Sequence, residues 1–202
     1  TKMPRFPFDK FADADPKLGT QMKATGEVMS VGRTFEESLL KAIRSLETGV
    51  YHLYMPKFEK ESINACMEYI KSGTNDRIFA IAHLLRAGMG VYEISGQTGI
   101  DCFFLNKMKE ITDLETELKA CIGDREALYQ AKKAGFSDWA VAWLWEKTEA
   151  EIFKLRRTYG IFPVYKMIDT CASEFESSVP YFYSTYEQEN ESVIGHGKKI
   201  VV

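Results

Sequence analysis

The sequence contains no apolar run long enough to cross a membrane, although hydrophobic residues make up 45% of its 202 positions. A membrane-spanning helix needs about 20 predominantly apolar residues in succession. The length suits one domain, or one domain with a piece of another, and the composition is sufficient for a sizeable core. We therefore expect a protein of the cytoplasm that has no membrane partner.

Motifs for metal binding and nucleophilic catalysis are also missing. The histidines lie far apart outside any H-E-x-x-H pattern, the cysteines form no C-x-x-C pair, and no G-x-S-x-G elbow is present. We expect free structural thiols, as in a reducing cytosol. The sequence thus predicts no catalytic, cofactor-binding or metal-binding residue. The residues concerned are His52, His83 and His196, and Cys66, Cys102, Cys121 and Cys171.

A surplus of positive charge is absent as well. The chain has 26 Lys and Arg against 29 Asp and Glu, for a net charge of −3. Nucleic-acid-binding domains usually carry a basic stripe, so this balance argues against such a partner. Gly26 and Gly32 resemble a phosphate-binding loop, but Gly32 lies one position too late and is followed by Arg33. A turn, a strand and a turn leading into a helix are favoured there.

The most informative stretch that is present covers residues 76–108. Apolar residues recur in it at helical spacing, Gly88 follows them at the place of a left-handed C-terminal cap, and Asp101 can cap the next helix. Ile100 before that cap and Leu105 inside the helix have the spacing of a hydrophobic staple. The pattern predicts helix, glycine turn, short helix, glycine turn and helix.

A similar pattern recurs at an offset of 47 positions, as from Gly88 to Gly135. Asp101 then aligns with Thr148, which begins its own capping box with Glu151. Each copy has an apolar stripe, so two helical units can bury these stripes against each other. We predict that this packing explains most of the middle of the chain.

The remaining segments complete a mainly α fold, an irregular multi-helix bundle of helical-hairpin units with a short extended or irregular N-terminal segment. Helices are predicted after a capping box at Thr34 and Glu37, over 61–73 and over about 101–120. Residues 1–19 are expected to be irregular and 49–60 a loop. A short strand is predicted near 181–187, then a linker, and another strand begins at the sequence KKIVV. The charged clusters at 113–119 and 146–157 are interpreted as solvated helix faces.

Three tryptophans lie close together on the short helix of the second unit. Indole rings usually bury a large area. We therefore predict that they pack in the core or form an interface, and that they do not hold a ligand. They are Trp139, Trp143 and Trp145.

Three segments closely resemble the large (synthetase) subunit of carbamoyl-phosphate synthase. They are MKATGEVMSVGRTFEESLLKAIRSLE, then DRIFAIAHLLRAGMG with IDCFFLNKM, and then PVYKMIDTCASEF with YFYSTYE. Their order and spacing also fit, so the resemblance covers nearly the whole chain. It implies that the chain is a fragment, as does its start at Thr1.

The resemblance implies three parts. Residues 1–47 would end the first ATP-grasp half, 48–198 would form the helical oligomerisation domain, and 199–202 would begin the second half. The parent makes carbamoyl phosphate from bicarbonate, ammonia and ATP with Mg²⁺ or Mn²⁺, for arginine and pyrimidine biosynthesis. Its implied partners are other large subunits, the two ATP-grasp halves and a glutaminase small subunit. Met22 and Thr25 would line the passage for ammonia and carbamate.

The fragment itself is expected to lack a complete active site, because the family's catalytic residues correspond to no part of it. An alternative hypothesis is a nucleic-acid-binding module that imitates a helix-turn-helix. Its phosphate contacts would come from Arg77, Arg86, Lys107 and Lys109, or from Lys154, Arg156 and Arg157.

Overall fold

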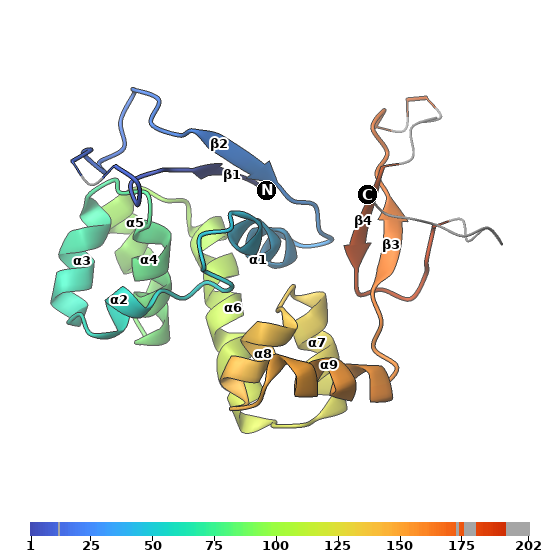
Figure 1. The fold of residues 1–202 in the computed structure, drawn as a ribbon. Coiled ribbons are helices and arrows are strands. Elements are labelled where there is room, and N and C mark those ends of the chain that lie inside the picture. The colour runs from blue at the N-terminus through green and yellow to red at the C-terminus, as the bar shows by residue number, and fades with distance from the viewer. Residues whose placement is uncertain (12, 173, 176–180, 193–202) are drawn as a thin grey trace.

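The computed structural model describes residues 1–11, 13–172, 174–175 and 181–192, and it confirms a mainly helical fold (Figure 1). The long helix α6 runs through the middle, with α3, α4 and α5 on one side and α7, α8 and α9 on the other. The elements are β1 (Lys2–Arg5), β2 (Gly26–Met29), α1 (Phe35–Ser45), α2 (Pro56–Glu59), α3 (Ile63–Lys71), α4 (Arg77–Arg86), α5 (Val91–Thr98), α6 (Cys102–Ala120), α7 (Arg125–Lys133), α8 (Asp138–Leu144), α9 (Glu149–Thr158), β3 (Val164–Met167) and β4 (Phe182–Thr185).

The two predicted units appear as α4–α5–α6 and α7–α8–α9. Their first turns match in detail. Gly88 has φ +87° and donates its N–H to the Leu85 carbonyl, while Gly135 has φ +90° and donates to the Lys132 carbonyl. These are the left-handed caps that the glycines predict, since only glycine enters this region without a Cβ penalty.

Side-chain caps set the starts of several helices. Asp101 accepts the N–H of Phe103, and Thr148 forms the complete capping box with Glu151. The box predicted at Thr34 is only half formed. Thr34 accepts the Glu37 N–H at 3.2 Å, but the Glu37 carboxylate accepts the N–H of Arg33 at 2.6 Å instead of that of Thr34. Glu37 is also paired with Lys41, four positions later in the same helix, so its carboxylate is held by two other partners.

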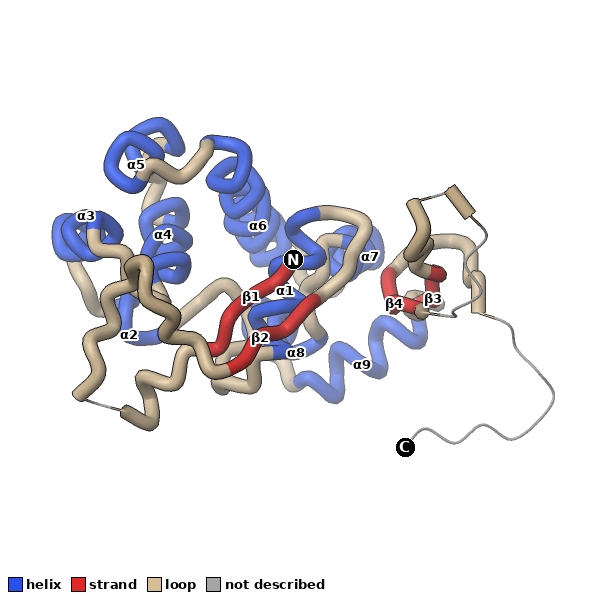
Figure 2. The backbone as a smooth tube through the Cα atoms, turned by 90° about the horizontal axis from the view of Figure 1, so that it is seen from above, coloured by secondary structure: helices blue, strands red, loops and turns tan. Residues whose placement is uncertain are grey.

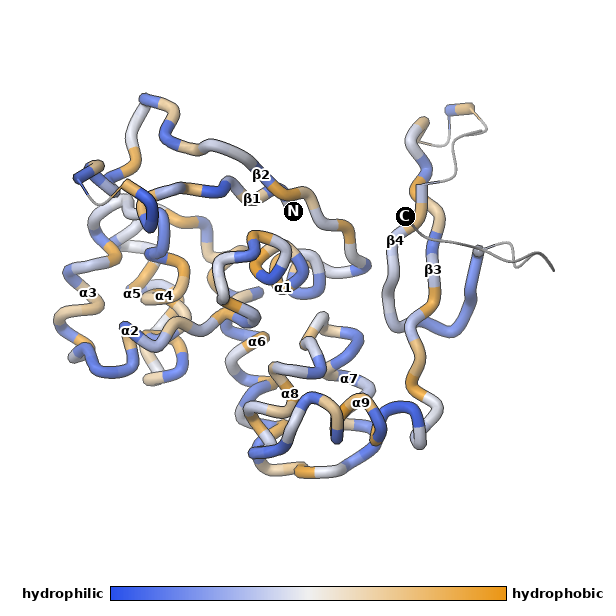
Figure 3. Tube along the Cα trace, viewed as in Figure 1, coloured by the Kyte–Doolittle hydropathy of each residue, from blue (hydrophilic) through white to orange (hydrophobic). Residues whose placement is uncertain are grey.

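One hydrophobic core joins α1 to both units. Leu40 and Ile43 of α1 are fully buried in the same cluster as residues of α4, α6 and α8. Apolar residues accordingly concentrate where these helices meet, as the orange segments of Figure 3 show. The predicted domain boundary at 47/48 stays a prediction, while in this chain α1 shares its core with the helices that follow.

Two local predictions were wrong. Residues 1–19 are not irregular throughout, because Lys2–Arg5 pairs antiparallel with Gly26–Met29 to form a hairpin that lies over α1 (Figure 2). Its partner strand is distant in sequence, which a local pattern does not reveal. Residues 49–60 are not entirely loop, because α2 begins at Pro56, whose fixed φ suits the first position of a helix.

The predicted strand near 181–187 is present as β4, which pairs antiparallel with β3 in the register Val164↔Thr185 to Met167↔Phe182. This second hairpin follows α9 and stands beside α1 and α7 (Figures 1 and 2). The strand predicted at KKIVV, the end of the predicted linker and residues 199–202 lie outside the described residues.

Candidate association surface

Four aromatic side chains form a row between the loop that follows α1 and helix α8. The ring of Tyr51 lies 5.4 Å from that of Trp139, which stacks on Trp143 at 6.3 Å and 14°. Trp143 in turn lies 4.7 Å from Tyr54. Tyr51 is 48% exposed and the other three are half-buried. The row is therefore a continuous aromatic surface that reaches solvent. We call it the aromatic row.

The local sequence explains why α8 presents its tryptophans in this way. Ser137 caps the helix by accepting the N–H of Ala140 at 3.0 Å. Trp139 and Trp143 are four positions apart, so they lie on one face of the helix. Val141 and Leu144 lie on the opposite side and are buried. The core thus fixes α8 and leaves the two indoles partly exposed.

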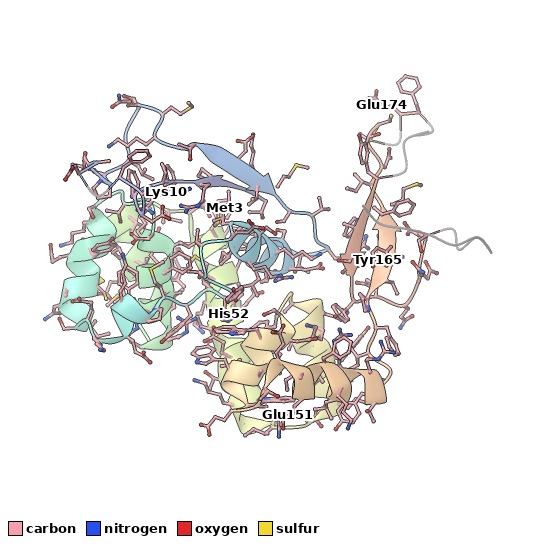
Figure 4. The ribbon with its side chains drawn as sticks, in the orientation of Figure 1. Met3, Lys10, His52, Glu151, Tyr165 and Glu174 are labelled. Atoms are coloured by element: carbon pink, nitrogen blue, oxygen red, sulfur yellow. The ribbon has the colours of Figure 1, made fainter. Side chains whose placement is uncertain are left out.

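Below the row, a buried polar group joins the loop to α4 and α6. His52 Nε2 lies 2.7 Å from Glu115 Oε1, and its ring lies 4.7 Å from that of Phe136. Arg86 donates to both Glu115 oxygens, at 2.6 and 2.7 Å, and to the Leu53 carbonyl at 2.6 Å. His52 and Glu115 are each 1% exposed. Figure 4 shows His52 in the middle of the molecule, close to α8.

The charges in this buried group are defined by its surroundings. Burial lowers the pKa of His52, although Glu115 opposes the shift. Burial alone would raise the pKa of Glu115, but hydrogen bonds from Arg86 and His52 lower it overall. Glu115 is therefore the anion, Arg86 its cation, and His52 a neutral ring that donates through its Nε2–H. This arrangement holds the backbone between the two tyrosines of the row.

Sequence reasoning missed this group. The cluster 113–119 was interpreted as a solvated face, which is wrong for Glu115 because its side chain is buried. The available signal was its spacing, since Glu115 lies four positions after Ile111 and three before Leu118, on the apolar side of α6. Its pairing with the distant His52 and Arg86 could not be read from spacing.

Of the predicted site residues, only Trp139 and Trp143 are brought together. Trp145 is 2% exposed and donates its indole N–H to the Leu118 carbonyl at 2.7 Å, so it packs in the core, whereas Trp139 and Trp143 belong to the aromatic row. Met22 and Thr25 lie in the loop between β1 and β2, and Met22 is 87% exposed. The roles proposed for these residues stay predictions.

A second aromatic cluster, also missed by sequence reasoning, lies where α1 and α6 begin. The Phe35 ring is 6.3 Å from Phe103 and 5.4 Å from Phe104. Phe103 and Phe104 are 54% and 45% exposed. The rings of Phe103 and Phe104 also lie 5.3 Å from each other, so the three phenylalanines form one partly exposed cluster. This cluster is a second candidate surface for a protein partner.

Within the described residues, no group of His, Cys, Asp or Glu has the arrangement of a metal site. The four cysteines are free, in agreement with the sequence analysis. No helix in the described part of the chain combines the length and apolar character needed to span a bilayer.

Comparison with known protein families shows which family the chain belongs to. The family described as carbamoyl-phosphate synthetase large chain, oligomerisation domain, matches residues 27–160. The chain belongs to this family. The matched oligomerisation domain contains all the helices from α1 to α9, and with them the complete aromatic row and the buried group below it.

Nothing in this oligomerisation domain supports the alternative of a nucleic-acid-binding module. Four of the cations that would meet phosphates are instead engaged with carboxylates. Arg86 is paired with Glu115 and Arg156 with Asp138, and two lysines of α6 are paired with acidic neighbours. Positive charge available for counterion release is correspondingly small.

Proposed function

We propose that this chain joins copies of a carbamoyl-phosphate synthase large chain, and that the aromatic row is the surface through which two copies meet. The family description supports association between large chains. The observation that carries the choice of surface is the half-exposed row from Tyr51 to Tyr54. Trp and Tyr dominate the energetically important positions of interfaces because they bury much area at a small entropic cost.

The test is the solution mass of the chain by light scattering across a concentration series. We expect a concentration-dependent dimer or larger species for the unchanged chain. Tyr51→Glu places a charge at the exposed end of the row, and Trp139→Glu places one at its centre. Each is expected to weaken association at least tenfold, since like charges of two copies would be buried together.

The matched control is Phe103→Glu, which puts the same charge into the other exposed aromatic cluster. It should leave the mass unchanged if the aromatic row is the interface. A monomer at every concentration, or a loss of association only with Phe103→Glu, would refute the proposal. Far-UV circular dichroism of each variant separates lost association from lost folding.

We also propose the wider setting that the resemblance implies. Residues 1–47 end the first ATP-grasp half, 48–198 form the helical domain and 199–202 begin the second half. The parent is a cytoplasmic ligase that uses ATP with Mg²⁺ or Mn²⁺ and receives ammonia from a glutaminase small subunit, for arginine and pyrimidine synthesis. The isolated chain should not hydrolyse ATP in a bicarbonate-dependent manner, and detection of that activity would contradict this assignment.

Met22 and Thr25 are proposed to line the passage for ammonia and carbamate in the parent. Their exposure in this chain supports the proposal, because a lining residue needs a free surface. In the whole enzyme, Met22→Trp should narrow the passage and lower carbamoyl phosphate formation severalfold, while bicarbonate-dependent ATP hydrolysis continues. An equal loss of both activities would show that Met22 only supports the fold.

A further inference from the structure

A small polar cavity lies where α1, the turn between α7 and α8, and the β3–β4 hairpin meet. Its volume is about 210 Å³. Tyr165, labelled in Figure 4, marks the side of the hairpin. The lining residues with charged or hydroxyl side chains are Glu37, Lys41, Arg44, Lys132, Tyr165, Ser184 and Tyr186.

The cavity lies beside more cations than the neighbouring carboxylates can balance. Lys132 and Arg156 share Asp138, at 2.7 and 2.8 Å. Lys41 is paired with Glu37 at 2.7 Å. Both carboxylates are thereby engaged. Arg44 has no carboxylate of its own. The four cations around the cavity therefore face only two carboxylates in the described part of the chain.

Of the four cations around the cavity, Arg44 is the one that forms no ion pair with a carboxylate of the described residues. Its guanidinium donates to the Gly135 carbonyl at 2.8 Å, which uses one of its five N–H groups. Burial lowers the pKa of Arg44, and Glu37 opposes this shift only through space. A guanidinium withdrawn from water without a counter-charge is costly, which favours an anion beside it.

Lys132 indicates the same deficit of negative charge, and Tyr186 places a hydroxyl beside it. Lys132 is 4% exposed, and burial lowers its pKa to about 8, with Arg156 and Arg44 adding to the shift despite the Asp138 partner. The Tyr186 ring lies 5.1 Å from the Lys132 ammonium at the cavity, and burial raises the pKa of the Tyr186 hydroxyl. A protonated hydroxyl in this position is available as a donor.

We propose that this cavity binds a small oxyanion of the phosphate class, with Arg44 as its main partner and Lys132 and Tyr186 as additional donors. A guanidinium presents parallel N–H groups that match two oxygens of such an anion. The volume corresponds to roughly seven water molecules at about 30 Å³ each. It therefore suits a phosphate ion with part of its hydration, whereas drug-sized ligands such as nucleotides need about 300 Å³ or more.

Bound anion would also fix the β3–β4 hairpin to the helical domain. Lys41 already bridges the two, because its ammonium donates to the carbonyls of Val31 and Ser184 at 2.9 and 2.5 Å. An anion between Arg44 on α1 and Tyr186 just after β4 adds a second bridge. The site thus couples ligand binding to the placement of the hairpin.

Inorganic phosphate is the probe for the test, and its binding to the 202-residue chain is measured by calorimetry at constant ionic strength adjusted with NaCl. We expect saturable binding and a melting temperature that rises with phosphate concentration, since a ligand of the folded state stabilises it. Arg44→Gln should weaken binding at least tenfold. Lys133→Gln, which changes the charge equally at a neighbouring position that does not line the cavity, should retain it.

Tyr186→Phe removes only the phenolic hydroxyl, which is one of the proposed donors. This second variant tests the proposal even if Arg44→Gln does not fold. It should weaken binding severalfold and leave the circular dichroism spectrum unchanged. The proposal is overturned if the unchanged chain shows no saturable binding. It is equally overturned if NaCl alone reproduces the stabilisation, or if the folded Arg44 and Tyr186 variants bind phosphate as the unchanged chain does.

Discussion

Gly88 and Gly135 occupy matching positions of the two units, but their surroundings differ. Gly88 and Gly135 both have positive φ, near +87° and +90°. A Cβ at Gly88 would meet nothing within 4 Å, but a Cβ at Gly135 would lie 2.7 Å from Glu37 Cα and 3.0 Å from the Glu37 carbonyl oxygen. Gly135 therefore serves as a helix cap and also lets α1 approach the second unit.

The comparison of Gly88→Ala with Gly135→Ala separates these two roles. Gly88→Ala should lower the free energy of unfolding by about 1–2 kcal/mol, the cost of a left-handed residue with a Cβ. Gly135→Ala should lower it by about 1–3 kcal/mol more, because overpacking against backbone is added. Urea denaturation measures both. Equal losses would mean that α1 can shift away from the turn at no cost.

At the scale of elements, His52, Arg86 and Glu115 connect the loop after α1 to α4 and α6. The backbones of this loop and these two helices are not paired with one another. Their relative positions must therefore be held by side-chain contacts. A buried ion pair whose remaining hydrogen bonds are satisfied does this well, since breaking it leaves an uncompensated charge. The aromatic row depends on this connection, because the loop carries two of its members.

The pH dependence of stability tests this connection. Since burial lowers the pKa of His52, the unfolded chain binds a proton there before the folded chain does. The contribution of His52 is therefore complete above its ordinary pKa of about 6.5 and is lost as the pH falls below it, by up to about 1.4 kcal/mol per pH unit.

Urea denaturation between pH 7.5 and 5.5 measures this slope, a range that lies above the titration of ordinary carboxyl groups. His52→Gln keeps a hydrogen-bond donor for Glu115 but does not titrate, so it should remove most of the slope. A slope that persists in His52→Gln would show that other groups govern acid stability in this range.

At the scale of the whole molecule, α6 packs against helices of both units and so joins them through one core. It contacts α1, α4 and α5 on one side and α7 and α8 on the other. Trp145 reinforces this, since its indole nitrogen is bonded to the α6 carbonyl of Leu118. Neither unit keeps a complete core without this helix.

We accordingly expect one cooperative unfolding transition. All three tryptophans lie in the second unit, so their fluorescence reports on that unit and on its contacts with α6 and the loop after α1, while far-UV circular dichroism reports on the helices of both units. The two thermal midpoints should coincide, as they do in two-state unfolding. Separate midpoints would mean that the units fold independently and that α6 belongs to only one of them.

Local sequence patterns predicted most of the helices and their order, with the exception of α2. The apolar spacing predicted α4 and α6, the glycines predicted the left-handed turns at Gly88 and Gly135, and Asp101 and Thr148 predicted helix starts. These features depend on neighbours within about four positions, and such local rules can be read from one chain. The first two quoted segments carried the family resemblance that the match over residues 27–160 bears out, whereas the third segment lies beyond the matched residues.

Which distant side chains meet could be seen only in the folded chain. The pairing of Lys2–Arg5 with Gly26–Met29, the burial of Glu115 beside His52, and the joining of Tyr51 to Trp139 all connect segments far apart in sequence. The same holds for the cations around the cavity, which come from α1, α7 and α9. Their charge balance follows from burial and mutual distance, which are properties of the packed chain and have no local signature in the sequence.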